Sequence, residues 1–581
     1  MVIKEKRKRQ RHLRTQPDQS LGISHIVVFP AFLALVGLGV YCRSLNGPFI
    51  YDDFTLPFYN PKFPTAVFTA WINGVRPMLM FSYWVCFQLS GRDPLSYHIV
   101  NLFLHIANSG AVLLAVRGIL AYAGISEWQR GALSVFGFAL FLLHPIQTES
   151  VAYIAGRSEV LSAFFFLVAF NVFLYRAGSI RWHRSLILLA LFGCALATKE
   201  HTIMLPILFL LTDAFWSVGS RIATIRGNWR LYVPILCGCL AAAGRIGWVV
   251  NASPSAGFKG AGVSWATYAL TECRVLLLYL RLLLFPVGQN FDHDIPWASS
   301  QSALPIMLSV LALLTLAIIA WRWRARFPIG AYGFAVFLLL LAPTTSFIPI
   351  KDAAAEHRLY LPMLGFVLIA CEFLLHLSRD KKWAFAIAGG LLCIAAIATQ
   401  QRNSVWASEA ALWEDTIAKS PNKLRDYGHL VHGLVREHRC QDALLRLEEV
   451  SHRLTPDASL LSHWSFAYEC VNDPADALEK LQASANLLPW PSTYLNMARH
   501  QLTLGRTQDA VQSLNHALRL DPHLEAAYVM RAGILEHEGD LLAAAHDYGQ
   551  ALRLNPDNQG ASWHLRQITV SQQNRSYLHS P

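Results

Sequence analysis

The sequence predicts an all-α protein made of a polytopic membrane helical bundle and a soluble α-solenoid that follows it. Three observations predict this fold class. Apolar stretches of membrane-spanning length recur from the start of the chain to about residue 400. The polar segments between them alternate between basic and mixed charge, and the last third is ordinary soluble sequence with an internal period. The overall composition, 54% hydrophobic and 15% charged in 581 residues, averages over these two parts.

The chain begins with a basic segment, residues 1–23, which we expect to be a cytoplasmic tail. The apolar stretch after it lacks an Ala-x-Ala cleavage site, so we expect an uncleaved transmembrane helix and not a signal peptide. The net charge of +11 comes mostly from Lys and Arg in segments that we assign to the cytoplasm. It indicates contact with anionic membrane lipids and no nucleic-acid partner, because a membrane anchor follows the basic segment immediately.

We expect a membrane domain over residues 24–401 with about eleven spans, at about 20 residues for each span. The expected helices are 24–43, 97–117, 131–145, 157–175, 185–199, 201–216, 231–250, 303–321, 330–348, 359–377 and 384–401. This number is odd, so a cytoplasmic N-terminus puts residues 402–581 in the periplasm or an organelle lumen.

One further stretch, residues 267–286, is apolar enough to span but carries Glu272, Arg274 and Arg281. If it crossed the membrane, the basic run at residues 322–326 would lie outside. We therefore expect an amphipathic helix on the outer surface, and we expect the same of residues 78–89.

The polar segments between the spans form two sets. The basic set is residues 4–14, 176–184, 221–230, 322–326 and 379–382. The mixed set is Asp52–Asp53, Glu149 with Arg157, Lys199–Glu200, Asp292-His293-Asp294 and Glu356-His357-Arg358. The positive-inside rule makes the basic set cytoplasmic, and the span count then places the mixed set on the other face. Ionisable groups at membrane boundaries are costly, so acids gathered on one face indicate a site.

Residues 402–581 are expected to form a repeat domain. Pro522 and Pro556 are 34 residues apart, as are Gly505 and Gly539. This is the tetratricopeptide period, and weaker copies extend it to about four repeats over residues 407–565. Such solenoids offer a concave surface for peptides or proteins. The ten cysteines show no CxxC pair, and we expect most of them to pack as small hydrophobic side chains.

Asp52 and Asp53 follow the first span by a few residues. Two adjacent carboxylates repel each other, so one of them holds its proton more tightly and can serve as a base near neutral pH. The alternative is a solvated turn, which Asp pairs often make.

Glu149 falls in a short outer loop, because Pro145 ends the helix before it. Arg157 opens the next helix and suits a phosphate, since a guanidinium pairs with phosphate in a bidentate manner. A structural ion pair between Glu149 and Arg157 is an equal alternative.

Lys199 and Glu200 form a tight outer turn, and Arg76, Arg274 and Arg358 can add positive charge on the same face. Acids are interleaved with these cations, which is typical of a site that binds an anionic leaving group and also needs a base. Asp292-His293-Asp294 could bind a divalent cation, although three consecutive residues cannot all point at one ion.

Several motifs occur in an order that resembles a known family. They are Tyr51-Asp52-Asp53, Arg76-Pro77, YHIVNLFLH over residues 97–105, HPIQTESVAYIAGR over residues 144–157, Lys199-Glu200, and EHRLYLP over residues 356–362. With the terminal repeats, they look like the transmembrane-and-tetratricopeptide-repeat (TMTC-type) family of GT-C glycosyltransferases. The long run ending at Arg157 is the most specific of them. The chain departs from the usual pattern at Glu159, where the family has Asp, and at His357, where a second basic or aromatic residue is common.

The resemblance implies a GT-C fold and a protein O-mannosyltransferase that takes mannose from a dolichyl or polyprenyl phosphate and passes it to Ser or Thr. It maps the catalytic acids onto Asp52 and Asp53, with Glu149 in the same site. The expected substrate-binding residues are Arg76, Arg157, Lys199, Glu200, His293, Glu356 and Arg358. The lipid-linked sugar phosphate is the donor substrate, a divalent metal ion is left open, and the repeats would present an acceptor polypeptide.

Two other functions stay open. The chain could be a GT-C transferase that modifies a lipid or polysaccharide, although a small acceptor does not need four repeats. It could also be a non-enzymatic membrane scaffold for the repeats, although one helix would suffice for that.

Overall fold

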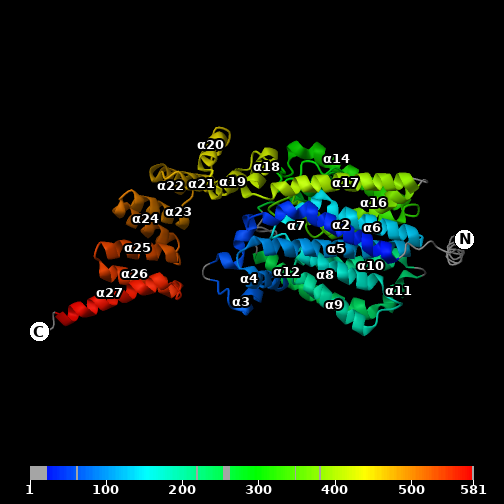
Figure 1. Cartoon of the computed structure of the whole chain (residues 1–581), viewed down its shortest axis with the longest axis horizontal. Helices are drawn as coiled ribbons and strands as arrows, with labels where there is room; N and C mark the ends of the chain where they lie inside the picture. The colour runs from blue at the N-terminus through cyan, green and yellow to red at the C-terminus, as the bar shows by residue number, and fades with distance from the viewer. Residues whose placement is uncertain are drawn as a thin grey trace. The chain divides into compact units, whose positions relative to one another are not determined.

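The computed structural model of the chain describes residues 23–60, 63–217, 220–252, 262–346, 348–377 and 381–578. Over these residues the regular elements are helices, and no strand is present (Figure 1). This confirms the predicted all-α class. The chain divides into two compact units, one ending at Ser408 and one beginning at Glu409. Residues 1–22, which hold most of the expected basic tail, lie outside the described part.

The first unit contains sixteen described α-helices joined by short loops and 3₁₀ turns. They are α2 (Ile23–Tyr41), α3 (Phe68–Ile72), α4 (Pro77–Ser90), α5 (Pro94–Tyr122), α6 (Glu127–Leu143), α7 (Thr148–Ala152), α8 (Arg157–Leu174), α9 (Trp182–Leu196), α10 (Leu205–Trp216), α11 (Arg221–Gly227), α12 (Trp229–Ala252), α13 (Trp265–Leu284), α14 (Ala303–Trp323), α15 (Pro328–Leu341), α16 (Met363–Leu377) and α17 (Lys381–Val405). The 3₁₀ turns are η1 (Cys42–Asn46), η2 (Tyr51–Thr55), η3 (Pro57–Tyr59), η4 (Pro145–Gln147), η5 (Glu200–Met204), η6 (Ser300–Ser302) and η7 (Glu356–Leu359).

Five described helices are long and apolar enough to cross a membrane: Val28–Asn46, Pro94–Tyr122, Arg157–Leu174, Ser300–Trp323 and Lys382–Val405. The pair α6 and η4–α7, bent by 50°, makes a sixth candidate if it is one span. Each of the eleven expected spans has a helical counterpart, but several counterparts are short. A helix of 15 residues such as α9 rises about 22 Å, less than the roughly 30 Å of a bilayer core. The count of about eleven is therefore not confirmed.

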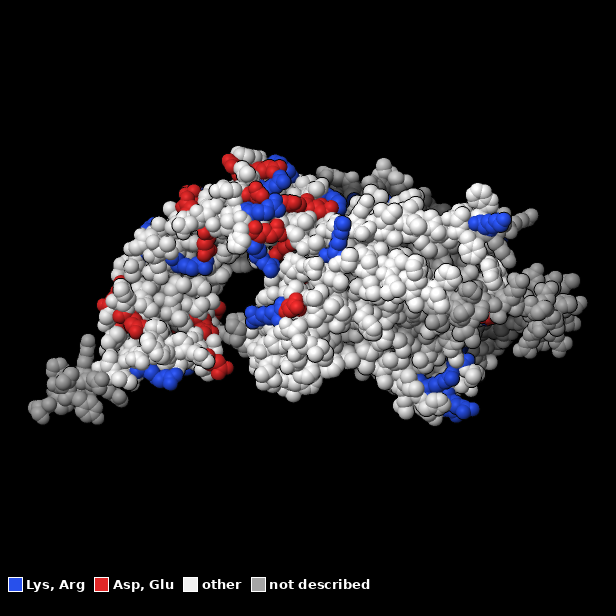
Figure 2. All heavy atoms as spheres, viewed as in Figure 1, with Lys and Arg blue, Asp and Glu red and all other residues white. Residues whose placement is uncertain are grey.

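The core of the first unit is built around α5, which packs against α6 and α8, while α2 and α17 pack together and against α6 (Figure 1). Few charges show on the surface of this unit in Figure 2, as expected of a surface that faces lipid. The short elements η2, η4, α7, η5 and η7 lie between these helices along the chain. These short elements carry the mixed-charge motifs, so helix packing in the bundle determines where the candidate site residues lie.

The second unit is a series of helix pairs, α18 (Glu409–Lys419), α19 (Leu424–Arg436), α20 (Cys440–Ser451), α21 (Ala458–Cys470), α22 (Pro474–Leu487), α23 (Pro491–Thr503), α24 (Thr507–Leu520), α25 (Glu525–His537), α26 (Leu541–Leu554) and α27 (Gln559–Leu578). Small residues such as Ala510, Ala517 and Ala544 are fully buried where neighbouring helices cross. Acidic and basic side chains are interspersed over its surface (Figure 2).

A disulfide joins Cys440, the first residue of α20, to Cys470, the last residue of α21, with their Cα atoms 5.7 Å apart. Sequence reasoning grouped the cysteines as small hydrophobic side chains and missed this pair. The signal was present, because these two are the only cysteines after residue 402.

Candidate functional site

The two aspartates of the loop between α2 and α3 have opposite environments. Both lie in η2, but Asp52 is exposed and Asp53 is fully buried. The preceding residue, Tyr51, has a φ of +48°, a left-handed conformation that is uncommon for a large side chain. Strained residues of this kind cluster at functional sites. The strained turn points the two neighbouring carboxylates in different directions.

Asp53 connects two loops. One oxygen accepts a hydrogen bond from the Ile50 N–H at 3.0 Å, and the other accepts from the Ala155 N–H at 2.8 Å. Burial raises the pKa of Asp53 well above the usual value of an aspartate, although the two backbone hydrogen bonds act in the opposite direction. Its carboxyl group thus holds the loop that contains η2 against the residues that precede α8.

Asp52 stands above a group of aromatic rings. Its backbone N–H donates to the Tyr153 hydroxyl at 2.9 Å. Phe291 contacts Tyr51, Tyr153 and Trp406, with ring centroids 5.5–5.6 Å apart. These rings make a rigid, largely apolar floor beside an exposed carboxylate.

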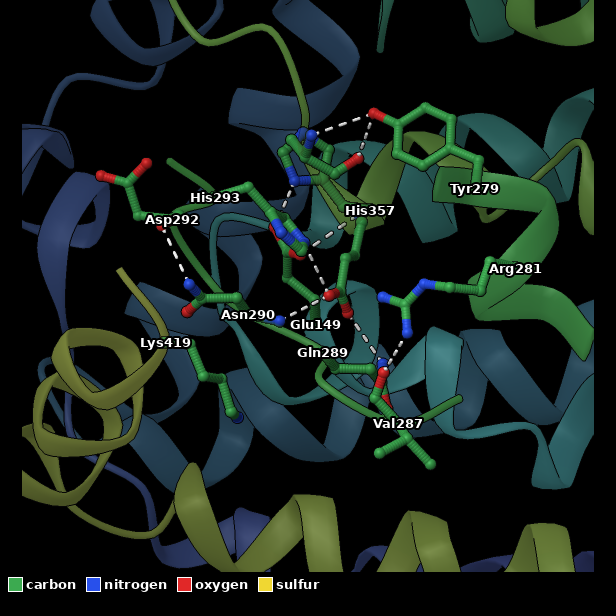
Figure 3. Close-up of polar contacts among 12 residues, drawn as sticks. Glu149, Tyr279, Arg281, Val287, Gln289, Asn290, Asp292, His293, His357 and Lys419 are labelled. Carbon is green, nitrogen blue, oxygen red and sulfur yellow. Dashed lines mark hydrogen bonds and ion pairs between the residues drawn. The ribbon is translucent and has the colours of Figure 1, made fainter. Parts of the chain in front are cut away.

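Glu149 bonds to His357, not to Arg157. The His357 Nδ1 atom is hydrogen-bonded to one oxygen of Glu149, and the His357 backbone N–H donates to the other at 3.2 Å (Figure 3). Glu149 comes from α7 and His357 from η7, so residues 208 positions apart meet here. The structural ion pair between Glu149 and Arg157 that the sequence suggested is replaced by this contact.

The contacts continue from His357 through Glu159 to Lys199. The Nε2 atom of His357 lies 4.0 Å from a Glu159 oxygen, and the Lys199 ammonium donates to the same oxygen at 2.6 Å. His201 lies 3.7 Å from the other Glu159 oxygen. Glu159 is buried at the start of α8. The structure therefore gathers parts of three loops around one glutamate to which sequence reasoning gave no role.

Arg76 and Glu200 form a bidentate ion pair. The Arg76 Nε and Nη2 atoms donate to the two Glu200 oxygens at 2.9 and 2.8 Å. Burial alone would raise the pKa of Glu200, but the hydrogen bonds and charge of Arg76 outweigh it and hold that pKa below its usual value. This geometry leaves the Nη1 edge of Arg76 facing away from the glutamate.

Arg157 is fully buried and held by groups of the bundle. Its guanidinium donates to Asn101 at 2.9 Å and to the Tyr97 carbonyl at 2.7 Å, and it stacks over the Tyr83 ring at 4.7 Å. It also donates to the Ser82 carbonyl at 3.2 Å. These contacts fit a structural role, because such a guanidinium has no open face for a phosphate.

Glu356 is a second buried glutamate with many donors. One oxygen accepts from the Asn290 N–H at 2.6 Å and contacts His293 Nε2 at 2.9 Å, and the other accepts from Gln289 at 2.8 Å (Figure 3). Burial would raise the pKa of Glu356, but the hydrogen bond and charge of His293, the charge of Arg402 and the Asn290 N–H together outweigh it and lower that pKa. The pair of Glu356 and His293 holds the segment after α13 against η7.

Arg358 donates to the carbonyls of Ala353 and Asp352 at 2.8 and 2.6 Å. Near it, on α13, lies the buried Glu272, whose pKa burial raises to about 7 in spite of the Arg358 charge. Sequence reasoning used Glu272 only as evidence against a span.

No group of three or more His, Cys, Asp or Glu side chains that could hold a metal ion occurs in residues 23–578 outside the gaps given above. Of the run Asp292-His293-Asp294, His293 pairs with Glu356. Sequence reasoning also left Glu159, His201 and His357 without a role. Two of them had a signal, because Glu159 comes two residues after the motif that ends at Arg157 and His357 lies in the EHRLYLP motif.

Comparisons with known proteins give three kinds of match: a family profile, similar sequences and solved structures. A tetratricopeptide-repeat family profile matches residues 491–524 and 525–558, which confirms the predicted repeat type. The protein O-mannosyl-transferase TMTC3 of Mus musculus is 24% identical over 554 residues, covering 85% of this chain and 58% of that protein. A protein O-mannosyl-transferase of Caenorhabditis elegans is 24% identical over 447 residues, covering 71% of this chain and 60% of that protein.

The chain thus spans about 58–60% of the length of these relatives. Among solved structures, a thermophilic tetratricopeptide-repeat protein of Thermus thermophilus aligns with 32% of this chain over 96% of its own chain. The two sequences are 16% identical there, and the TM-score is 0.25.

Proposed function

Because the chain resembles the TMTC-type family over 85% of its length, as its motifs predicted, we propose that it is a membrane glycosyltransferase. In this proposal it moves mannose from a polyprenyl or dolichyl phosphate to Ser or Thr hydroxyls of proteins. The observation that carries the proposal is the exposed carboxylate of Asp52 on the loop that Asp53 ties to the Glu149–His357–Glu159–Lys199 network.

The proposed reaction is a single displacement. The acceptor oxygen forms a bond to the anomeric carbon of mannose while the bond from that carbon to the phosphate oxygen breaks. The electron pair of the broken bond leaves with the phosphate, and the acceptor proton goes to Asp52. Asp52 is favoured over Asp53 as the base because both oxygens of Asp53 already accept backbone hydrogen bonds.

The leaving phosphate needs positive charge more than it needs a strong acid. Arg76, Lys199 and Arg358 supply that charge in the proposal. Each is held by partners that fix its position. Arg157, which the sequence also suggested here, is better explained as a structural residue because its guanidinium is enclosed by the bundle.

The proposal includes a GT-C arrangement of eleven spans with the N-terminus in the cytoplasm and the repeats outside. The helices α9, α10, α12, α15 and α16 complete that count beside the candidate spans given above. The Cys440–Cys470 disulfide supports an outer location of the repeats, since disulfides persist in oxidising compartments and are rare in the cytosol. The repeats would then present an acceptor polypeptide to the membrane unit.

Reconstituted full-length protein tests the proposal. We expect transfer of mannose from a polyprenyl phosphate donor to a Ser/Thr-rich peptide, detected as a hexose added to the peptide by mass spectrometry. Asp52→Asn should abolish most of this transfer. Asp557→Asn, which makes the same change on an exposed carboxylate of the repeat unit, should not.

The same assay separates the other two functions. Consumption of the donor with sugar found on a lipid or polysaccharide, and none on protein, would favour the other GT-C acceptor class. If every donor and acceptor gives no turnover while the protein is folded, the scaffold function is favoured.

A further inference from the structure

We propose that His357, oriented by Glu149, contacts the phosphate of the donor, and that donor binding brings a proton onto His357. This inference rests on the proposed function and deepens it, because it assigns the donor-contacting nitrogen and gives Glu149 a different task.

The first step is the geometry of Glu149. Its side chain is 4% exposed, and both of its oxygens bond to His357, one to the ring and one to the backbone N–H. A carboxylate engaged in this way does not reach a substrate hydroxyl. It fixes the orientation of the imidazole instead, as carboxylate–histidine pairs do elsewhere. Glu149 is therefore a positioning residue in this proposal and not the base.

The second step is exposure. The His357 side chain is 30% exposed, whereas those of Glu149, Glu159, Lys199 and His201 are 4%, 5%, 16% and 10% exposed. His357 is thus the most open member of the connected group. Its Nε2 atom lies 4.0 Å from Glu159, beyond hydrogen-bond distance, so that nitrogen is available to a ligand.

The third step is the state of the other cations. Lys199 is paired with Glu159 and Arg76 with Glu200. Arg358 donates to two carbonyls, and Arg157 is enclosed. Each of the four is already bonded to protein groups, although the Nη1 edge of Arg76 faces away from Glu200. A further N–H donor at the open side of the group would therefore strengthen the binding of a leaving phosphate.

The fourth step is charge balance. Glu149, Glu159 and Glu200 carry three negative charges, and Lys199, Arg76 and Arg358 carry three positive ones, so the group has no positive charge to spare. An anionic phosphate added to it leaves a net negative charge unless a proton enters with the phosphate. The charged and titratable groups around His357 are Glu149 on α7, Glu159 on α8, Lys199 and His201 at η5, Tyr279 on α13 and its neighbour Arg358. Of these, only His357 combines an exchangeable proton site with exposure to the ligand side.

Binding of a short-chain polyprenyl phosphate to the full-length protein in detergent tests this proposal, with polyprenol of the same length as the uncharged probe. Calorimetry in two buffers of different ionisation enthalpy should give uptake of close to one proton for the phosphate and none for the alcohol. His357→Gln should weaken phosphate binding by at least about tenfold and remove the proton uptake, since a charge-assisted hydrogen bond is lost. Glu149→Gln should weaken it less.

Two further variants keep the test independent of folding. His357→Lys should restore binding without proton uptake, because a lysine is already charged. His376→Gln, on α16 and outside this network, should bind as wild type does. As a second measurement, polyprenyl phosphate should slow the acylation of His357 by diethyl pyrocarbonate in the wild-type protein, with the site read by mass spectrometry.

The proposal is overturned if wild type and His357→Gln bind the phosphate equally, or if wild type does not bind it. It is also overturned if the proton uptake persists without His357. No sugar or acceptor is present, so a protein that binds the phosphate with proton uptake but transfers no mannose would contradict the proposed function alone. Active transfer with an unaffected His357→Gln variant would contradict this inference alone.

Discussion

Asp52 and Asp53 are neighbours of the same residue type, yet their side chains have different surroundings. Asp52→Asn should therefore reduce mannose transfer by at least about 10²-fold, the usual scale of general-base catalysis, with little change in thermal stability. Asp53→Asn should instead lower the stability by about 1–3 kcal/mol, because an amide keeps one acceptor oxygen where two backbone N–H groups need one each. Transfer activity and the melting temperature in detergent, measured on both variants, check this prediction.

Either of two results would contradict these roles of Asp52 and Asp53. If Asp52→Asn transferred sugar at the wild-type rate, Asp52 would not be the base. If Asp53→Asn kept its melting temperature, the two backbone hydrogen bonds would contribute little to the loop.

Glu356 should make the stability of the membrane unit sensitive to acid. Its pKa is lowered in the folded protein, so its contribution is fully present above the ordinary pKa of a glutamate, about 4.3, and is lost as the pH falls through the lowered value. The melting temperature should be steady from pH 7 down to about pH 4.3 and should fall below that pH. Glu356→Gln should begin lower at pH 7 and fall less, because its amide cannot accept from all the donors around it. Glu448→Gln, on an exposed glutamate of α20, is the matched control and should follow wild type.

At the residue scale, the sequence was a better guide to the residues of the candidate site than to the partners that they bond to. The pattern at residues 52–53 and 144–157 indicated a site, and the structure does bring Glu149 and Lys199 into one network. It could not predict that Arg157 turns into the bundle toward Asn101, because that depends on how α5 and α8 pack. The partner of Glu149 lies 208 residues away, and no local pattern encodes such a contact.

At the element scale, helices α15 and α16 cross at two glycines. A Cβ atom on Gly333 would lie 2.6 Å from the Gly365 carbonyl oxygen, and the same conflict holds in the other direction. Small residues at such crossings let the backbones of membrane helices approach closely. Gly333→Ala should therefore lower the stability by about 1–3 kcal/mol through overpacking.

Gly193→Ala on α9 is the control for this crossing, because a Cβ atom there would meet nothing within 4 Å. It should be neutral or slightly stabilising, since alanine has the higher helix propensity. Thermal unfolding of both variants in detergent checks the pair, and equal effects would show that the α15–α16 crossing can open at no cost.

Element lengths were the weakest part of the sequence prediction for a physical reason. Hydropathy locates an apolar run, but a helix ends where Pro, Gly or a buried polar contact ends it. Pro145 divides one apolar run into α6 and the bent η4–α7 segment. The tetratricopeptide repeats were easier to predict, because a fixed period is visible in the sequence itself.

At the scale of the whole molecule, the location of the repeat unit follows from chemistry that can be measured directly. If residues 402–581 lie outside the cytoplasm, Cys440 and Cys470 should resist a maleimide reagent in intact cells until a reductant is added. Serine substitution of both should remove the labelling that appears after reduction. A reporter that is active only in the cytoplasm, fused after Pro581, should be silent.

Maleimide labelling and the reporter fusion test the topology independently, and together they would reveal an error in the span count. A reporter active in the cytoplasm, with both cysteines labelled before reduction, would place the repeats inside and make the number of spans even.

The helix that would then have to cross the membrane is α13, which carries Glu272, Arg274 and Arg281 and which we expect on the outer surface. If α13 crossed the membrane, the loop with His293 and the loop with Glu356 would lie on the cytoplasmic side of the count. The 2.9 Å contact between His293 and Glu356 would then join two loops on the same side. Gln289, however, donates hydrogen bonds both to Glu356 and to the Pro145 carbonyl of η4, just before Glu149. These two bonds would join opposite faces of the membrane. The bond to the Pro145 carbonyl is buried and 3.0 Å long, so we expect the reporter to be silent and the repeats to be outside.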